Sequence, residues 1–389
     1  MVFRSWPFLE REWLIQGITF IITFFAVNKF YTSRSFIYVI LYCIVLLINV
    51  LWGDTLYKDY VTVIIELFKY CVPGAITYYL LKTNDIKGIK NTVYLFFALI
   101  VFTTVSSFVI NLSFPGVIRI YVGYINGHQD QSQFIPYLRM GMSNYYLPHA
   151  LPVLIPALFL GVTNRNLTKY VRFFILITWI CIVILTYLSG ATTALLFSII
   201  FSIVVLFIRR ASLKKNITIV VITFLVILPL IAERQVLSSL LYNLEETLIG
   251  TDYSAKVVQL ADIVESGQVT DGDAGERSDL YSQTVTQFFK HPLLGTNEPV
   301  GGHSALLDRL ACLGLIGFIP FVMFFVFQIK YVLKFLRNEI KVFYILGMVI
   351  AFLMLLLKYM LYIEMSVIML TILPLAVKLF GDYPELSKR

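Results

Sequence analysis

A histidine marks the boundary between a long polar stretch and an apolar segment of membrane-spanning length. His303 follows Gly301 and Gly302 and precedes the apolar run Ser304–Phe327. A neutral imidazole has a reference pKa of about 6.5, and nearby arginines would lower the pKa further, so at neutral pH it can accept a proton from a sugar hydroxyl. We take His303 as a candidate general base. A hydrogen-bonded histidine at the start of a helix fits the sequence equally well.

Two arginines are candidate ligands for a phosphate group. Arg277 is the only base in the acidic run from Asp271 to Asp279, and Arg139 lies shortly before an apolar segment. A guanidinium group can bind a phosphate through two parallel hydrogen bonds. The alternative for Arg277 is a surface ion pair with a neighbouring acid. The alternative for Arg139 is a side chain that extends toward the membrane surface. Both pairs of interpretations remain open from the sequence.

Three charged residues fall inside apolar segments. Glu66 and Lys69 are one helical turn apart, and Glu364 lies early in the last apolar segment. A charge in hydrocarbon is costly unless it is paired or faces a wet cavity. We expect Glu66 and Lys69 to form a structural ion pair. Glu364 fits a structural role, a proton path or the polar floor of a substrate cavity, and the three together are a candidate intramembrane polar site.

The composition indicates a membrane protein. Hydrophobic residues make up 59% of the 389 residues and charged residues only 14%, whereas soluble globular proteins contain about 25% charged residues. We predict an all-α polytopic integral membrane protein in which residues 1–389 form a single transmembrane bundle. The four cysteines lie inside apolar runs, so we expect core residues rather than a disulfide framework or a metal site.

Apolar runs of membrane-spanning length predict about 11 transmembrane helices, within a range of about 10–12 because the first residues could add a partial span. The predicted helices are Trp13–Phe30, Phe36–Trp52, Tyr60–Leu81, Thr92–Ser113, Tyr145–Thr163, Tyr170–Leu188, Thr192–Ile208, Ile217–Ala232, Ser304–Phe327, Val342–Leu357 and Tyr359–Phe380.

The segments that connect these helices alternate in charge. One set is strongly basic, which places it and the C-terminus in the cytoplasm. The other set then lies outside and includes two long loops, 114–144 and 233–302. The larger loop is acidic, with a segment predicted to be flexible at Gly267–Gly275. Its predicted short helices are Val236–Leu248, Ala255–Val264 and Ser278–Phe289.

Motifs for soluble nucleotide donors are absent from the sequence. It contains no phosphate-binding loop, no Rossmann glycine fingerprint and no Asp-x-Asp dyad at a membrane boundary. A transferase with this sequence would use a donor activated by a lipid phosphate, with no metal and no other cofactor. The net charge of +8 arises in short loops on one side, so it reflects membrane topology and predicts no nucleic-acid partner.

The stretch from Gly275 to Gly317 resembles the O-antigen polymerase and O-antigen ligase family (Wzy/WaaL). The sequence GERSDLYSQTVTQFFKHPLLG is followed by GGHSALLDRLACLGLIG. In the family an arginine heads a short periplasmic helix, a "hPllG" motif follows, and a histidine opens a helix that contains "GliG". Arg277, His291–Gly295, His303 and Gly314–Gly317 match these pieces in order and spacing.

The resemblance implies a glycosyltransferase of the bacterial inner membrane with its active site facing the periplasm. Its donor would be an undecaprenyl-diphosphate-linked glycan. His303 would act as general base on an acceptor hydroxyl, and Arg277, helped by Arg139, would stabilise the departing diphosphate while the anomeric centre inverts. The sequence departs from the family at Ala191-Thr192, where many members carry an arginine in a Ser-Arg or Thr-Arg pair. Arg139 is the candidate replacement for that charge.

This departure favours the polymerase, which joins lipid-linked repeat units, over the ligase, which transfers a glycan to the lipid A core. The resemblance further implies membrane lipids, a chain-length-regulating co-polymerase and a flippase as partners. Two other classes remain open. A transporter or flippase for a lipid-linked glycan would use Glu66, Lys69 and Glu364 as its path, although no inverted repeat supports it. A non-catalytic scaffold of a polysaccharide assembly complex would not need His303.

Overall fold

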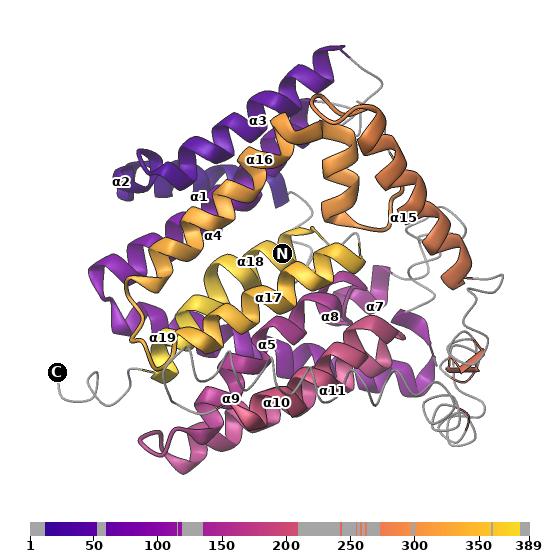
Figure 1. The fold of residues 1–389 in the computed structure, drawn as a ribbon. Helices are drawn as coiled ribbons and strands as arrows, with labels where there is room; N and C mark the ends of the chain where they lie inside the picture. Colours follow the sequence, from indigo (N-terminus) through magenta and orange to yellow (C-terminus); the bar gives the residue numbers. More distant parts are fainter. Residues whose placement is uncertain are drawn as a thin grey trace.

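The computed structural model describes residues 12–52, 60–114, 116–118, 135–208, 273–296, 300–358 and 361–381, with isolated positions between 242 and 262. Every regular element in these ranges is a helix (Figure 1). The predicted helix Ile217–Ala232 lies outside the described residues. The other predicted segments are helical in their described residues, with some shifted ends.

Helix bounds follow the apolar runs closely, and several helices continue directly into one another. The elements are α1 Glu12–Ala26, α2 Asn28–Tyr31, α3 Arg34–Trp52, α4 Tyr60–Thr83, α5 Ile86–Ser113, α7 Ile135–Arg139, α8 Tyr146–Ala150, η2 Leu151–Leu154, α9 Ile155–Thr163, α10 Lys169–Leu188, α11 Thr192–Phe207, α15 Asp273–Lys290, α16 Ala305–Leu333, α17 Lys341–Leu357, α18 Ile363–Val367, η3 Ile368–Ile372 and α19 Leu373–Gly381.

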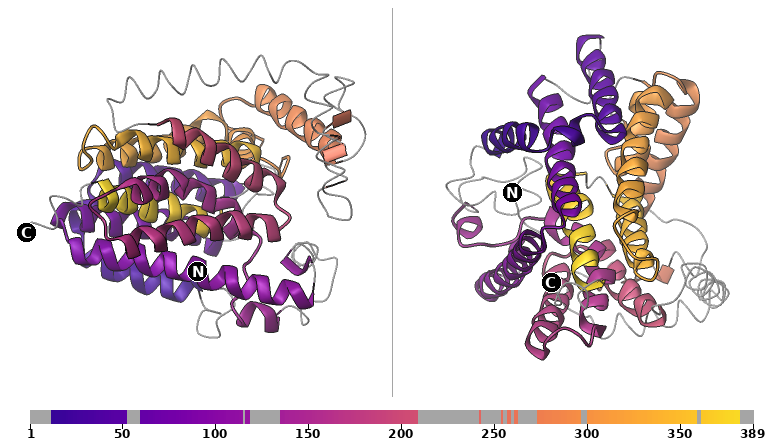
Figure 2. Two further views of the ribbon diagram at one scale, coloured as in Figure 1. Left: turned by 90° about the horizontal axis from the view of Figure 1, so that it is seen from below. Right: turned by 90° about the vertical axis from the view of Figure 1, so that its left-hand side faces the viewer.

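Within the described ranges, seven helical segments are long and apolar enough to cross a membrane, and three shorter helices are also apolar. Their outward faces carry large exposed apolar side chains such as Phe25, Leu95, Leu112 and Phe173. Faces of this kind suit contact with lipid rather than water. The chain is therefore a multi-pass membrane protein. Figure 2 shows the helices side by side along a common direction, with α15 at one end of the bundle.

Two helix ends differ from the prediction for identifiable reasons. The helix predicted to start at Thr92 begins at Ile86, because the carboxylate of Asp85 accepts a hydrogen bond from the Gly88 amide (2.9 Å) and caps the helix before its apolar run. The predicted first helix is broken at Val27. Beyond the break the chain turns inward and buries the rings of Phe30 and Tyr31.

The predicted external loop 233–302 is described mainly at its C-terminal end. At isolated positions of its first two predicted helices, the hydroxyl of Tyr242 donates to Oδ1 of Asp262 (2.6 Å). The third predicted helix starts at Asp273 instead of Ser278, so the prediction of flexibility for Gly267–Gly275 was wrong for its last three residues. Acidic residues in the first turns of α15 interact favourably with the positive end of the helix dipole, which accounts for the earlier start.

A proline and a π-helical turn face each other inside the bundle. Pro73 interrupts the backbone ladder of α4, and η3 is a π-helical segment. The hydroxyl of Thr371 donates to the Pro73 carbonyl (3.0 Å), and the hydroxyl of Thr77 donates to the Leu370 carbonyl (2.6 Å). Thus α4 and η3 each supply a threonine hydroxyl that donates a hydrogen bond to a backbone carbonyl of the other. This exchange holds the last helix against α4, because a polar backbone group in a membrane interior must find an internal partner.

Helix α16 changes direction sharply at Gly314 (Figure 1). Gly314 has φ 57° and ψ −168°, a conformation open in practice only to glycine. A Cβ atom on Gly314 would lie 2.3 Å from the Leu293 carbonyl oxygen, and one on Gly295 would lie 2.2 Å from the Cys312 carbonyl oxygen. The segment that follows α15 therefore rests directly on the backbone of α16.

Backbone hydrogen bonds close this contact. The amide of Leu315 donates to the Pro292 carbonyl (2.9 Å), and the amide of Ile316 donates to the Leu293 carbonyl (3.1 Å). In return, the amide of Thr296 donates to the Ala311 carbonyl (2.9 Å). The break in α16 frees backbone groups, and the neighbouring segment supplies their partners.

We predict that Gly314→Ala and Gly295→Ala each lower the free energy of unfolding by about 2 kcal/mol or more, from backbone strain and backbone overlap. The four cysteines are buried, so thermal unfolding in detergent can be followed by their reaction with a thiol-reactive dye. Gly17→Ala is the matched control, since its added Cβ meets only ordinary contacts at 3.6 Å. Melting curves for Gly314→Ala that coincide with those of the control would contradict the close backbone contact.

Candidate functional site

His303 lies in the turn that leads into α16. Its side chain is half-buried. The next residue, Ser304, caps the helix, because its hydroxyl oxygen accepts a hydrogen bond from the Leu307 amide (3.1 Å). Gly301 and Gly302 before it have φ values of 77° and 82°, which glycine adopts without strain. The sequence Gly-Gly-His-Ser thus places an imidazole at the start of a membrane helix.

Asp308 holds this turn from the inside. Its side chain is 1% exposed, and Oδ2 accepts a hydrogen bond from the Gly302 amide (3.0 Å). A Cβ atom on Gly301 would approach Oδ1 of Asp308 to 2.5 Å and the hydroxyl oxygen of Thr284 on α15 to 2.4 Å. The turn is therefore clamped between α15 and α16. A carboxylate in the first turn of α16 also interacts favourably with the positive end of the helix dipole.

The end of α17 connects to the same turn. The Lys358 carbonyl accepts a hydrogen bond from the Ala305 amide at the start of α16 (3.2 Å). The Leu357 carbonyl accepts one from the hydroxyl of Tyr281 on α15 (2.8 Å). Carbonyls at a helix C-terminus have no partner within their own helix, so α15 and α16 satisfy those of α17. These bonds fix the position of the His303 turn relative to the bundle.

Glu66, Lys69 and Arg309 form a buried charge cluster next to this end of α16. The ion pair expected between Glu66 and Lys69 is present. The guanidinium NH2 of Arg309 lies 3.6 Å from Oε2 of Glu66. Lys69 Nζ also donates to the Leu361 carbonyl (2.8 Å), between α17 and α18. The cluster thereby joins α4 to α16 and to the segment that follows α17.

Arg309 is held by further contacts. Its Nε donates to the hydroxyl oxygen of Tyr42 on α3 (3.0 Å), and NH1 donates to the Ala305 carbonyl (3.3 Å). The guanidinium carbon lies 5.4 Å from the centre of the Phe321 ring, a cation–π distance. Sequence reasoning missed both Asp308 and Arg309. The signal was present, because both charges fall inside a predicted apolar span, the same criterion that singled out Glu66.

Glu364 has a structural partner at the same end of the bundle. It is 4% exposed, and Oε1 accepts a hydrogen bond from the side-chain amide of Asn144 (2.7 Å). Asn144 in turn accepts a hydrogen bond from the Leu147 amide at the start of α8 (2.9 Å). Next to this pair, Tyr362 stacks on Tyr146 with ring centres 3.7 Å apart. The carboxylate of Glu364 therefore ties α18 to α8.

The other histidines differ in setting. His291 is exposed, and His128 lies outside the described residues. His149, which sequence reasoning did not consider, is fully buried in α8 with Nδ1 3.0 Å from the Tyr145 carbonyl oxygen. A single polar residue inside an apolar span was the available signal. His303 is thus the described histidine that lies in a glycine turn at the end of a membrane helix.

The structure describes only the backbone positions of the two candidate arginines. Arg277 belongs to α15 and Arg139 is the last residue of α7, and the side chains of both lie outside the described residues. At Ala191-Thr192, where many members of the family that the sequence resembles carry a Ser-Arg or Thr-Arg pair, Ala191 is buried just before α11. The expected meeting of Arg277, Arg139 and His303 therefore remains a prediction.

The chemistry available at this end of the bundle is that of an imidazole able to exchange a proton and of arginines able to bind an anion. The described residues contain no group of three or more His, Cys, Asp or Glu side chains placed to hold a metal ion. No known protein-family model matches the chain, and no curated protein matches it significantly. The inference of function therefore rests on the residues themselves.

We predict that Glu66→Gln destabilises the protein by about 3–5 kcal/mol, because two buried cations lose their shared carboxylate. Lys69→Met should cost less, since Glu66 keeps Arg309. The double variant Glu66→Gln/Lys69→Met should be more stable than Glu66→Gln alone. Thermal unfolding in detergent measures all three.

The control for this series is Glu339→Gln, which removes an exposed ion pair with Arg337 (3.2 Å). It should change stability by no more than about 0.5 kcal/mol. If Glu66→Gln and Lys69→Met lower the stability equally, and the double variant loses the sum of the two, the charges do not form a coupled cluster.

Proposed function

We propose that the protein is a membrane glycosyltransferase that polymerises undecaprenyl-diphosphate-linked oligosaccharide repeat units into a surface polysaccharide. The observation that carries this proposal is the contact between two motifs. The segment His291–Gly295 lies on the break in α16 at Gly314, through the hydrogen bonds from Leu315 and Ile316. The segments that resemble O-antigen polymerases and ligases thus lie in contact. This contact holds α15 next to the His303 turn.

In the proposed reaction His303 takes the proton of an acceptor hydroxyl. The acceptor oxygen then forms a bond to the anomeric carbon of the donor, and the bond from that carbon to the phosphate oxygen breaks. The electron pair leaves with the undecaprenyl diphosphate, whose charge Arg277 stabilises, with Arg139 as helper. Attack from the side opposite the leaving group inverts the anomeric centre. No metal or other cofactor takes part in this scheme.

The register of α15 supports the role of Arg277. Arg277 precedes Tyr281 by four residues and Thr284 by seven, so the three positions fall on one side of the helix. Tyr281 and Thr284 are the residues of α15 that meet the end of α17 and the glycine turn. Position 277 therefore falls on the side of α15 that carries Tyr281 and Thr284.

Contacts between connections support the predicted topology. At the end opposite the charge cluster, the side chain of Asn164 donates to the Phe380 carbonyl (2.7 Å), and Lys378 donates to the Phe335 carbonyl (3.0 Å). These residues come from connections expected in the cytoplasm because of their basic charge. We propose that this end faces the cytoplasm of a bacterial inner membrane and that the His303 turn faces the periplasm.

The ligase remains the nearest alternative, since the two activities share the motif. Ala191-Thr192 in place of an arginine pair favours the polymerase, with a chain-length-regulating co-polymerase and a flippase as its expected partners. The transporter alternative is weaker, because Glu66 pairs with Arg309 of α16, and Lys69 and Glu364 bond to residues just outside neighbouring helices. Charged side chains with such partners connect helices and form no evident path for a lipid-linked glycan.

We predict that His303→Ala reduces polymer formation by about 100-fold or more, the usual contribution of a general base. The measurement is chain extension of lipid-linked repeat units by purified protein in liposomes, with the amount of protein in the membrane checked in parallel. Glu339→Gln, at the opposite end of the bundle, serves as control. Polymer of normal length and amount from His303→Ala would refute the assignment of the base.

We predict that Arg277→Lys also loses at least about tenfold in rate, because lysine keeps the charge but cannot form the two parallel hydrogen bonds to a phosphate. The same liposome assay measures this loss. Arg337→Lys is the matched control, since Arg337 is exposed and pairs with Glu339. Unchanged polymerisation by Arg277→Lys would instead favour a surface ion pair for Arg277.

A further inference from the structure

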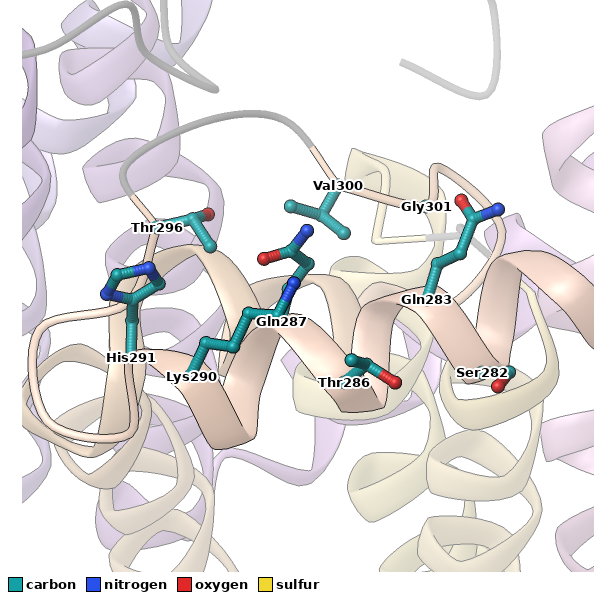
Figure 3. Close-up of a pocket in the computed structure, with 9 residues that line it drawn as sticks. All are labelled: Ser282, Gln283, Thr286, Gln287, Lys290, His291, Thr296, Val300 and Gly301. Atoms are coloured by element: carbon teal, nitrogen blue, oxygen red, sulfur yellow. The ribbon is translucent and has the colours of Figure 1, made fainter.

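A polar cavity of about 530 Å³ lies beside α15 and reaches the His303 turn. Gly301 lines its end, two residues before His303, and Thr296 and Val300 of the segment after α15 face it across the opening (Figure 3). Cavities that bind small ligands have volumes of about 300–1,000 Å³. Four α15 side chains form its floor: Ser282, Gln283, Thr286 and Gln287.

The lining matches the hydrogen-bonding pattern of a sugar. Side-chain amides and hydroxyls both donate and accept hydrogen bonds, as sugar hydroxyls do. Among the described lining residues Val300 is the only apolar aliphatic side chain. A lipid chain or a flat apolar ligand needs a mainly apolar wall. The cavity therefore suits a hydroxylated ligand.

A lysine and a histidine lie at one end of the cavity. Lys290 and His291 line it where α15 ends, and none of the described lining residues is Asp or Glu. This is unexpected from composition, because acids outnumber Lys and Arg in the segment 233–302. A ligand with a negative group at that end would be attracted by Lys290 without a competing carboxylate among the described lining residues.

We propose that this cavity binds the acceptor glycan and that an anionic substituent of that glycan contacts Lys290. The assignment rests on the transferase function proposed above. A general base must come within hydrogen-bonding distance of the acceptor hydroxyl, about 3 Å, and Gly301 joins the cavity to His303. The donor diphosphate lies near Arg277, which is about 20 Å from Lys290 along the axis of α15 at about 1.5 Å per residue. The two substrates thus occupy different parts of one helix.

The first experiment measures binding directly. The full-length protein in nanodiscs is titrated calorimetrically with the repeat-unit oligosaccharide released from the polysaccharide of the source bacterium. We expect Gln287→Ala to weaken binding by about fivefold and Lys290→Ala by about tenfold or more, since a hydrogen bond to a charged group contributes more than one between neutral groups. Lys290→Arg should restore most of the affinity. Lys341→Ala, an exposed lysine bonded to Asn338 (2.7 Å), should leave it unchanged.

Two chemical treatments of the oligosaccharide identify its anionic substituent. Reduction of the carboxyl groups of the oligosaccharide removes uronic acid charge, and enzymatic dephosphorylation removes phosphate substituents. One treatment should weaken binding to wild-type protein by about tenfold and leave binding to Lys290→Ala unaltered. If neither treatment changes the affinity, the contact of Lys290 with an anion is wrong.

Kinetics then separate acceptor from donor. With a soluble acceptor, Gln287→Ala and Lys290→Ala should raise KM for the acceptor and leave KM for the lipid-linked donor unchanged. A raised donor KM alone would assign the cavity to the donor glycan and overturn the proposal. His303→Ala should still bind the oligosaccharide, with an affinity lowered by no more than about fivefold, because it loses one hydrogen bond to the acceptor hydroxyl. Binding with no turnover in that variant supports both proposals, whereas normal binding by Gln287→Ala and Lys290→Ala refutes only the cavity.

Discussion

The contact of two backbones at Gly295 and Gly314 is the constraint on which the candidate site depends. A side chain at either position would overlap carbonyl groups of the other segment. Because the backbones touch, the break in α16 exchanges hydrogen bonds with the segment after α15 instead of leaving polar groups bare in the membrane. The same contact fixes where α15 lies. The glycine turn, His303 and the polar cavity all follow from the position of that helix.

The buried charge cluster of Glu66, Lys69 and Arg309 stabilises the other side of the candidate site. The carboxylate of Glu66 pairs with two buried cations, Lys69 and Arg309. Lys69 also bonds to a backbone carbonyl and Arg309 to Tyr42, which offsets part of the cost of desolvation. Such a cluster is poor evidence of extra stability. It does fix the register of α16 against α3 and α4, and with it the orientation of the His303 turn.

The sequence predicted what hydropathy and local spacing control. Apolar runs located the described membrane helices, and the one-turn spacing of Glu66 and Lys69 predicted their ion pair. Tyr42 and Asn144 escaped notice because their partners lie on distant helices, and no local pattern reports such contacts. The break at Gly314 was equally hidden. Glycine is common in membrane helices, and only the approach of a second backbone makes this one indispensable.

Composition alone would have given the wrong electrostatic picture of the site. The segment 233–302 is acidic overall, which by itself would repel a diphosphate and an anionic glycan. The helix distributes these charges unevenly. Asp273 and Glu276 fall in the first turns of α15, where the helix dipole favours acids, and Lys290 falls in the last turn, where it favours a cation. The preference that stabilises the helix therefore also leaves the cavity at its far end without carboxylates among its described lining residues.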